Sequence, residues 1–219
     1  KNKIKAPKLI KQNYRKNLIE IEDLGNVSIY YKLKNRKINK LKYYKKIIFL
    51  LSKLQNIKTK KIKTFNNTNY IVPKYSNNKL WKESSLFLDW YIPRVIKKKK
   101  QKIIKKKLKN IIKILLKKIK NQNHVFVHRD FHVSNLMEYK KKIAIIDNQD
   151  ALYGNHAYDL ASLIDDVRLK TSNSLKEKIF KYYLKQNKST NTENFKNDFD
   201  LLSVLRNIKI IGIFSRLST

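Results

Sequence analysis

The chain has 219 residues, of which 42% are hydrophobic, and can bury a core as one domain or as one domain and a piece of another. It contains no cysteine, which excludes disulfides and thiolate metal sites. No apolar run approaches the roughly 18 residues of a membrane-spanning helix, and the N-terminal segment KNKIKAPKLI lacks the apolar centre of a signal peptide. We therefore expect a cytoplasmic protein.

The charge is strongly positive: 52 basic residues against 16 acidic ones give a formal net charge of +36 at pH 7. Such a charge is typical of proteins that bind nucleic acid or an anionic membrane. The lysines are nevertheless spread along the chain together with many Asn and Ile residues, a composition that AT-rich coding sequences favour. Genome composition therefore explains much of the charge, and we do not expect nucleic acid as a partner. A basic surface would still attract an anionic nucleotide.

The first predicted elements are a strand, a helix and a loop. Residues 17–24 alternate apolar and polar side chains and end at Gly25, which predicts a strand and a turn. Residues 38–56 place apolar side chains at three- and four-residue steps, which predicts a helix. The polar segment 64–78, rich in Asn and Thr, predicts a loop.

Two helices are predicted next. Residues 79–96 put their apolar side chains on one helical face, with Pro93 as the stop. Residues 96–120 are the most basic segment and carry an apolar stripe of Ile104, Leu108, Ile111, Leu115 and Ile119. Membrane-surface helices and calmodulin targets share this pattern. We favour a core helix with a solvated lysine face, because a strand and a polar loop follow it directly.

The rest of the chain predicts a small strand-rich centre inside a mostly helical body. His124–Val127 is a predicted strand, and Ile143–Ile146 is its expected hairpin partner. Further helices are predicted over residues 156–170, 174–187 and 195–218.

The residues that can carry chemistry lie in the loops after these two strands. His128, Asp130 and Asn135 form a His-x-Asp-x-x-x-x-Asn motif, and Asp147 follows at the end of an apolar run. Phosphoryl transfer needs a carboxylate that accepts a hydroxyl proton, and oxygen ligands that hold Mg²⁺ against the nucleotide phosphates. Asp130 can supply the first, and Asn135 and Asp147 offer the hard oxygen ligands that Mg²⁺ prefers. We expect His128 to organise the loop through hydrogen bonds.

Each of these residues taken alone has an ordinary structural explanation. Asp130 or Asn135 would more often be a turn residue than a catalyst, and Asp147 could equally cap a helix. Their combination between two apolar strands is what favours a kinase.

The segments HRDFHVSNLM, IAIIDNQDALYG and AYDLASLIDDVR resemble the aminoglycoside phosphotransferase and choline kinase family. Within it, the chain is most similar to bacterial anomeric kinases that phosphorylate N-acetylmuramate and N-acetylglucosamine. Residues 20–25, 81–91 and 206–214 resemble the hinge, the first large-lobe helix and a late helix of that group. The resemblance implies ATP and Mg²⁺ as cofactors and a small-molecule acceptor, a sugar or amino-sugar hydroxyl.

The resemblance also implies roles for individual residues. Asp130 would be the catalytic base, Asn135 and Asp147 the Mg²⁺ ligands, His128 a loop organiser, and Asp159 an aspartate that ties the large lobe together.

Two further groups of residues would contact ligands. The hinge residues Glu20, Glu22 and Asp23 would lie at the nucleotide, where backbone groups receive adenine. His132, Gln149 and Asp150 lie where the acceptor sugar would approach.

The implied architecture is an α+β protein-kinase-like fold, mostly its helical C-terminal lobe. Residues 1–25 would be the end of the N-terminal lobe and the hinge, and residues 26–219 the C-terminal lobe, truncated at both ends. A Gly-rich phosphate loop, its lysine and a glutamate partner would lie upstream, so we expect the chain alone to be poorly active or inactive. Asn148 stands where related kinases carry Phe, so the packing of the metal loop is expected to differ.

Two alternatives remain open. A protein-kinase-like enzyme is disfavoured by Asn148 and Gln149 in place of Phe-Gly and by the lack of an Ala-Pro-Glu segment downstream. A nonenzymatic basic module that binds nucleic acid would explain the charge of +36 directly. The sequence determines neither the acceptor nor the oligomeric state.

Overall fold

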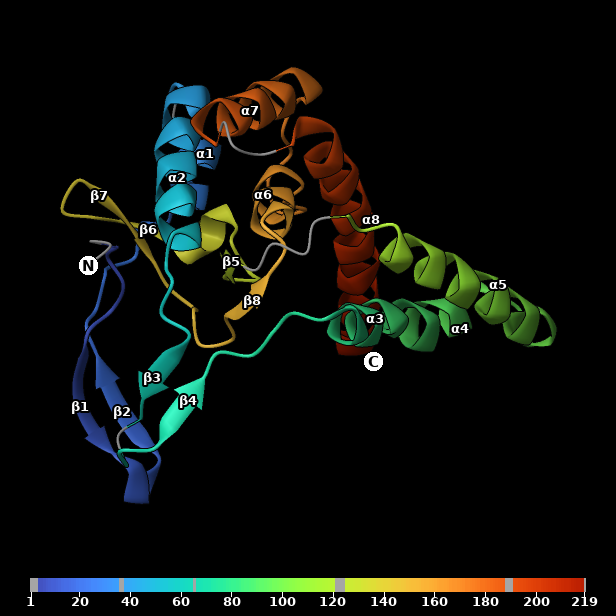
Figure 1. The fold of residues 1–219 in the computed structure, drawn as a ribbon, viewed down its shortest axis with the longest axis horizontal. Coiled ribbons are helices and arrows are strands. Elements are labelled where there is room, and N and C mark those ends of the chain that lie inside the picture. The colour runs from blue at the N-terminus through green and yellow to red at the C-terminus, as the bar shows by residue number, and fades with distance from the viewer. Residues whose placement is uncertain (1–3, 36–37, 65, 121–124, 188–190, 219) are drawn as a thin grey trace.

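The computed structural model describes residues 4–35, 38–64, 66–120, 125–187 and 191–218. Helices dominate it, and short strands lie between them and along one side (Figure 1). In these residues no helix is both long and apolar enough to cross a membrane.

The sheets are antiparallel pairs of short strands. In the described parts of the chain the pairs are β1 (Leu9–Asn13) with β2 (Leu18–Ile21), β3 (Lys61–Lys63) with β4 (Asn69–Ile71), β5 (Val125–Val127) with β8 (Leu152–Gly154), and β6 (Leu136–Tyr139) with β7 (Lys142–Ile145). The strand predicted over residues 17–24 is confirmed as the shorter β2. The predicted loop 64–78 is wrong in part, because β4 lies within it.

The predicted hairpin of residues 124–127 with 143–146 is wrong. β5 pairs with β8, and His124 lies outside the described residues. The partner of β7 is β6, which the sequence reading missed. Lys140 and Lys141 join β6 to β7 with φ of 48° and 63°. A tight two-residue turn of this kind favours pairing of the two strands that it connects over pairing with a more distant strand.

The helices carry the rest of the fold. They are α1 (Ile29–Asn35), α2 (Lys40–Gln55), α3 (Asn77–Leu86), the π-helical η2 (Phe87–Tyr91), α4 (Ile92–Val95), α5 (Lys98–Lys117), α6 (Ala157–Ile164), α7 (Asn173–Gln186) and α8 (Thr192–Leu217), with short 3-10 turns η1 (Tyr14–Lys16) and η3 (Val133–Asn135). The predicted helices 38–56, 96–120, 174–187 and 195–218 are confirmed as α2, α5, α7 and α8. Side chains of Asn39, Ser76, Ser172 and Asn191 cap the N-termini of α2, α3, α7 and α8.

Two predicted helix ends are wrong. Pro93 does not stop its helix, because it lies in the first turn of α4, where its missing N–H is not needed. The helix predicted over 156–170 ends at Ile164. Asp166 Oδ1 accepts the Arg168 N–H at 3.0 Å, and this side-chain turn replaces the helical hydrogen bonds.

The buried face of α5 differs by one position from the predicted stripe. Ile111 is 50% exposed, whereas Ile112 and Leu116 are buried. The helix packs mainly on α3, and its inward-facing side chains follow one another at four-residue spacing from Leu108 to Ile112. Its lysines face solvent.

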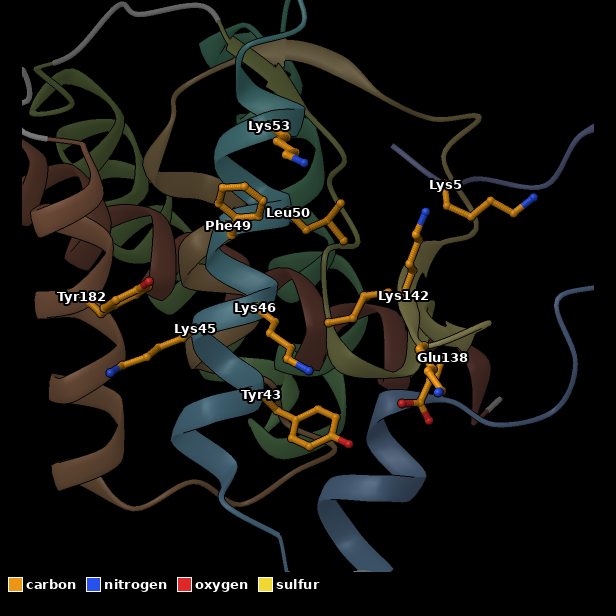
Figure 2. Close-up of a pocket in the computed structure, with 12 residues that line it drawn as sticks. Lys5, Tyr43, Lys45, Lys46, Phe49, Leu50, Lys53, Glu138, Lys142 and Tyr182 are labelled. Atoms are coloured by element: carbon orange, nitrogen blue, oxygen red, sulfur yellow. The ribbon is translucent and has the colours of Figure 1, made fainter. Parts of the chain in front are cut away.

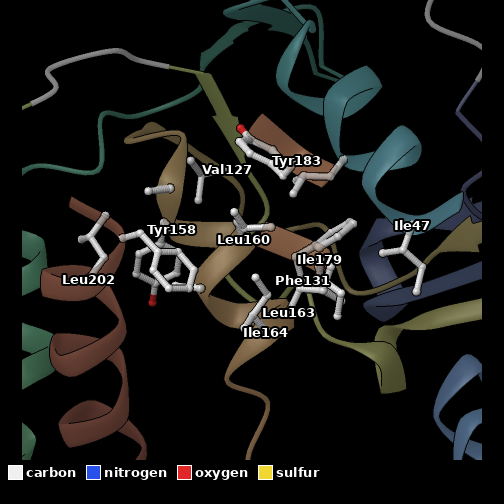
Figure 3. Close-up of a cluster of buried hydrophobic side chains, with 14 of the residues drawn as sticks. Ile47, Val127, Phe131, Tyr158, Leu160, Leu163, Ile164, Ile179, Tyr183 and Leu202 are labelled. Atoms are coloured by element: carbon white, nitrogen blue, oxygen red, sulfur yellow. The ribbon is translucent and has the colours of Figure 1, made fainter. Parts of the chain in front are cut away.

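The core is centred on α6, in which all eight residues are buried. Figure 3 shows Leu160 and Leu163 of this helix among side chains that include Ile47 of α2, Ile179 and Tyr183 of α7, and Val127 and Phe131. The N-terminal end of α6 is therefore buried in the core, next to the loop that follows β5.

Candidate active site

The loop after β5 is anchored to α6 by one buried carboxylate. Asp159 is 1% exposed, and its two oxygens accept the backbone N–H groups of His128 at 2.7 Å and Arg129 at 3.0 Å. Burial raises the pKa of Asp159 to about 7, against the lowering effect of these two hydrogen bonds. The contact fixes the backbone immediately before Asp130.

His128 joins the two loops of the motif. Its ring is fully buried, and its Nε2 lies 3.0 Å from the carbonyl oxygen of Ile146, the residue before Asp147. Burial lowers the pKa of His128, which favours the neutral ring as a donor to this carbonyl. The side chain therefore holds the two loops at a set separation.

Two residues of the site have left-handed backbone conformations. Arg129 has φ of 75° and Asp147 has φ of 63°. Such values are uncommon for residues other than glycine, and they persist where the surrounding structure imposes them. Here the hydrogen bonds of His128 and Asp159 hold both loops.

The three residues expected to carry phosphoryl transfer lie together. Asn135 Nδ2 donates to the carbonyl oxygen of Asp130 at 3.1 Å and lies 3.4 Å from Asp147 Oδ2. Gln149 Nε2 donates to Asp147 Oδ1 at 2.6 Å. With its amide nitrogen used in this way, Asn135 has its amide oxygen left for a cation beside the Asp147 carboxylate. One amide oxygen and one carboxylate, completed by phosphates and water, fit the ligand preference of Mg²⁺.

A charged network under the loop was missed at the sequence level. Glu83 of α3 forms ion pairs with Arg129 and, at 2.9 Å, with Lys209 of α8, and the Tyr75 hydroxyl donates to the same carboxylate. Burial opposes ionisation of Glu83, but the Lys209 charge and the Tyr75 bond outweigh it and lower its pKa. The Arg that follows the motif histidine was the only signal that such a partner existed.

The expected acceptor residues separate in space. Gln149 and Asp150 line a cavity of about 360 Å³ together with Arg129 and Glu83. His132 is 5% exposed and does not line it. Burial, followed by the nearby Arg168 charge, lowers the pKa of His132 to about 4.

The expected hinge residues lie at the end of the β1–β2 hairpin. Glu20 is exposed in β2, Glu22 forms an ion pair with Lys5, and Asp23 Oδ1 accepts the Gly25 N–H at 2.7 Å in a turn. Leu24 is buried against Met137 and Ala144 of the β6–β7 hairpin. The segment expected to be the hinge thus contacts the hairpin that connects the two loops.

A further cavity, of about 570 Å³, lies between α2 and the β6–β7 hairpin (Figure 2). Its charged lining comprises Lys5, Lys45, Lys46, Lys53, Glu138, Lys141 and Lys142. None of the residues expected in the active site lines it.

Comparison with known sequences identifies similar proteins. The model of the phosphotransferase enzyme family matches residues 42–193. An N-acetylmuramate/N-acetylglucosamine kinase of Neisseria meningitidis is 35% identical over 102 residues, which cover 44% of this chain and 30% of the relative. Its counterpart of Pseudomonas aeruginosa is 30% identical over 144 residues, covering 62% of this chain and 42% of the relative. The chain therefore spans less than half the length of these relatives.

A solved structure shows a similar fold. An ethanolamine kinase of Plasmodium vivax matches with a TM-score of 0.63 at 18% identity, covering 97% of this chain and 67% of that chain. The mixed α+β, mostly helical arrangement of this chain is therefore similar to the fold of that kinase.

Proposed function

Because the chain belongs to the phosphotransferase enzyme family, we propose that it takes part in transfer of the γ-phosphoryl group of ATP to a hydroxyl group of an amino sugar. The observation that carries this proposal is the convergence of Asp130, Asn135 and Asp147 within hydrogen-bonded loops. Hydrogen bonds of His128 and Asp159 to the backbone hold these loops in place.

Asp130 is the proposed catalytic base. The acceptor oxygen attacks the γ-phosphorus, the bond from that phosphorus to the bridging oxygen breaks, and ADP leaves. The hydroxyl proton passes to Asp130 as the new O–P bond forms. Asn135 and Asp147 are the proposed ligands of Mg²⁺, which supplies charge neutralisation at the phosphates when bound.

The remaining expected residues have positioning or binding roles in this proposal. His128 and Asp159 orient the loop that carries Asp130. The segment of Glu20, Glu22 and Asp23 is the proposed hinge and offers backbone groups to adenine. Residues 1–25 then form the end of an N-terminal lobe and residues 26–219 the C-terminal lobe, and the use of ATP favours the cytoplasm.

The amino-sugar acceptor rests on sequence relatives. Both relatives named above are N-acetylmuramate/N-acetylglucosamine kinases, at 30% and 35% identity over the matched residues. The matched structure is an ethanolamine kinase, so choline-type acceptors are the competing class to test.

The direct test is a phosphorylation screen of the full-length gene product with ATP and Mg²⁺. Amino sugars, choline and aminoglycosides are offered as acceptors, and we expect transfer to N-acetylmuramate or N-acetylglucosamine. The variant Asp130→Asn should lower kcat by about 10²–10⁴-fold, the usual contribution of a general base. Asp200→Asn is the matched control, because Asp200 lies on α8 in an exposed pair with Lys196. Transfer only to choline or an aminoglycoside, or full activity of Asp130→Asn, would contradict the proposal.

A further inference from the structure

A small cavity opens directly on the proposed catalytic base. It has a volume of about 70 Å³, and Asp130 is part of its lining. Arg206 and Lys209 of α8 and Arg168 line it as well. Ile213 and Phe214 of α8 add an apolar wall. The cavity therefore combines a carboxylate, three cations and an apolar surface at the proposed catalytic base.

Arg206 is the unusual member of this group. It is only 4% exposed, and the single hydrogen bond of its side chain in the described residues joins Nη1 to the Asp165 carbonyl oxygen at 3.4 Å. Within that part of the chain, no carboxylate lies within ion-pair distance of its guanidinium group. A guanidinium group has five N–H donors and stays charged at any relevant pH. Leaving such a charge buried and unpaired is costly, so the site favours an anion.

The carboxylates near the cavity already have other partners. Glu83 forms ion pairs with both Lys209 and Arg129. Arg168 lies 3.4 Å from Asp166 Oδ1. The oxygens of Asp159 accept two backbone N–H groups, and the Arg206 charge acts on this carboxylate without forming an ion pair with it.

The charge balance around the cavity is therefore positive. Three cations, Arg168, Arg206 and Lys209, line it together with a single carboxylate, that of Asp130. Asp166 and Glu83, which pair with Arg168 and Lys209, do not belong to the lining. When the reaction transfers a proton to Asp130, the excess of positive charge grows by one.

The volume restricts what can enter. Pockets that hold whole drug-sized ligands have volumes of about 300–1,000 Å³. A cavity of about 70 Å³ accepts a substituent of the acceptor rather than the sugar ring. A carboxylate matches both this size and the planar donor fork of arginine.

We propose that this cavity is a subsite for a carboxylate group of the acceptor, bound by Arg206 together with Arg168 and Lys209. The inference rests on the proposed amino-sugar kinase function and narrows its acceptor to an acidic amino sugar. N-Acetylmuramate and N-acetylglucosamine are suitable probes, because they differ by a lactyl ether that carries a carboxylate. The same three cations would instead contact the transferred phosphoryl group if the acceptor were neutral, and the experiment must separate the two cases.

The test measures kcat/KM of the full-length gene product for both sugars. The variant Arg206→Lys keeps the charge but loses the donor fork. We expect it to lower the ratio of kcat/KM for N-acetylmuramate over N-acetylglucosamine by at least about 10-fold, as for the loss of a hydrogen bond to a charged group. Arg168→Gln, whose native side chain is 39% exposed, should lower the ratio in the same direction and is less prone to unfold. Lys196→Gln, on the same helix in an exposed pair, is the control and should leave the ratio unchanged.

The outcomes separate the two proposals. Parallel losses on both sugars, with a raised KM for ATP, would place the cations on the phosphoryl group and overturn the carboxylate subsite. An unchanged ratio in Arg168→Gln would also overturn it, even if Arg206→Lys does not fold. If neither sugar is phosphorylated, the proposed function fails. Calorimetry then decides the subsite, which requires tighter binding of N-acetylmuramate than of N-acetylglucosamine and loss of that preference in Arg206→Lys.

Discussion

At the scale of single residues, the site depends on side chains that hold backbone rather than substrate. Asp159 binds the N–H groups of His128 and Arg129, and Glu83 binds the Arg129 side chain. Arg129 has a left-handed backbone, so its conformation depends on these partners. Asp130, the next residue, takes its position from them.

Glu83→Gln tests this dependence. The change leaves Arg129 and Lys209 without their shared carboxylate in a partly buried site, and breaking a buried ion pair costs about 3–5 kcal/mol. We expect a lower free energy of unfolding, measured in urea, and a fall in kcat of the full-length enzyme. Glu177→Gln is the control, because Glu177 is exposed in α7 and lies 4.0 Å from Lys181. Equal effects of the two substitutions would show that the Glu83 network does not hold the loop.

The pKa values of the buried histidines indicate how the free energy of unfolding should depend on pH. Burial lowers the pKa of His128, His132 and His156, and that of His132 falls to about 4. The ordinary pKa of histidine is about 6.5, so below this pH the unfolded chain binds a proton at His132 that the folded protein does not bind. The contribution of His132 to stability is therefore lost as pH falls from about 6.5 towards 4, by at most about 1.4 kcal/mol per pH unit.

Comparison with His132→Gln isolates this effect from the opposing contribution of Asp159, whose raised pKa has the reverse sign. The free energies of unfolding of the wild type and of the variant should converge, or change order, as pH falls from 6.5 to 5. A difference that stays constant over this range would contradict a buried neutral His132.

At the scale of elements, α8 is packed closely against the junction of α3 and η2. A Cβ atom added at Gly212 would lie 2.5 Å from the backbone carbonyl carbon of Leu86 and from the backbone nitrogen of Phe87. Glycine is therefore required here for close approach of two helices. Because α8 also carries Arg206 and Lys209, this contact helps to set the position of the cavity beside Asp130.

Gly212→Ala should consequently destabilise the protein. Alanine gains about 1 kcal/mol in helix propensity over glycine, but overpacking against rigid backbone typically costs about 1–3 kcal/mol. We expect a lower melting temperature by circular dichroism. Val204→Ala, at a position of α8 that is 48% exposed, should have a much smaller effect. A stabilised Gly212→Ala variant would mean that α8 does not approach α3 as closely as described.

At the scale of the whole molecule, the excess of positive charge should lower the stability of the folded state. Six lysines and one carboxylate, Glu138, line the cavity between α2 and the β6–β7 hairpin (Figure 2). Glu138 already pairs with Lys32. Like charges at a surface repel, and a net charge of +36 adds to this repulsion.

Salt should therefore stabilise the protein. The Debye length falls from about 30 Å at 0.01 M to about 10 Å at 0.1 M ionic strength, so most of the screening occurs in this range. We expect the melting temperature to rise between these concentrations and then to level off. NaCl and KCl should act alike if screening is the cause, and a melting temperature that falls with both salts would contradict this account.

Local spacing in the sequence predicted a large part of the fold and the grouping of Asp130, Asn135 and Asp147. The helices α2, α5, α7 and α8 follow from apolar periodicity, and β2 from alternation. The errors occurred where neighbours in space compete: the partner of β7, the end of α6 and the buried face of α5. Hydrogen-bond partners and helix faces depend on which other elements pack nearby, and spacing does not contain that information.

The sequence by itself identified the residues that we propose for phosphoryl transfer, because Asp130 and Asp147 follow short strands and Asn135 lies in the loop between them. Only the tertiary structure brought Glu83 to Arg129 across 46 residues and placed Arg206 of α8 beside Asp130. These contacts join elements far apart in the chain, and the packing of α8 against α3 and α6 sets their geometry. The chemistry can therefore be read from a short segment, whereas the selectivity that we propose depends on how the whole helical body packs.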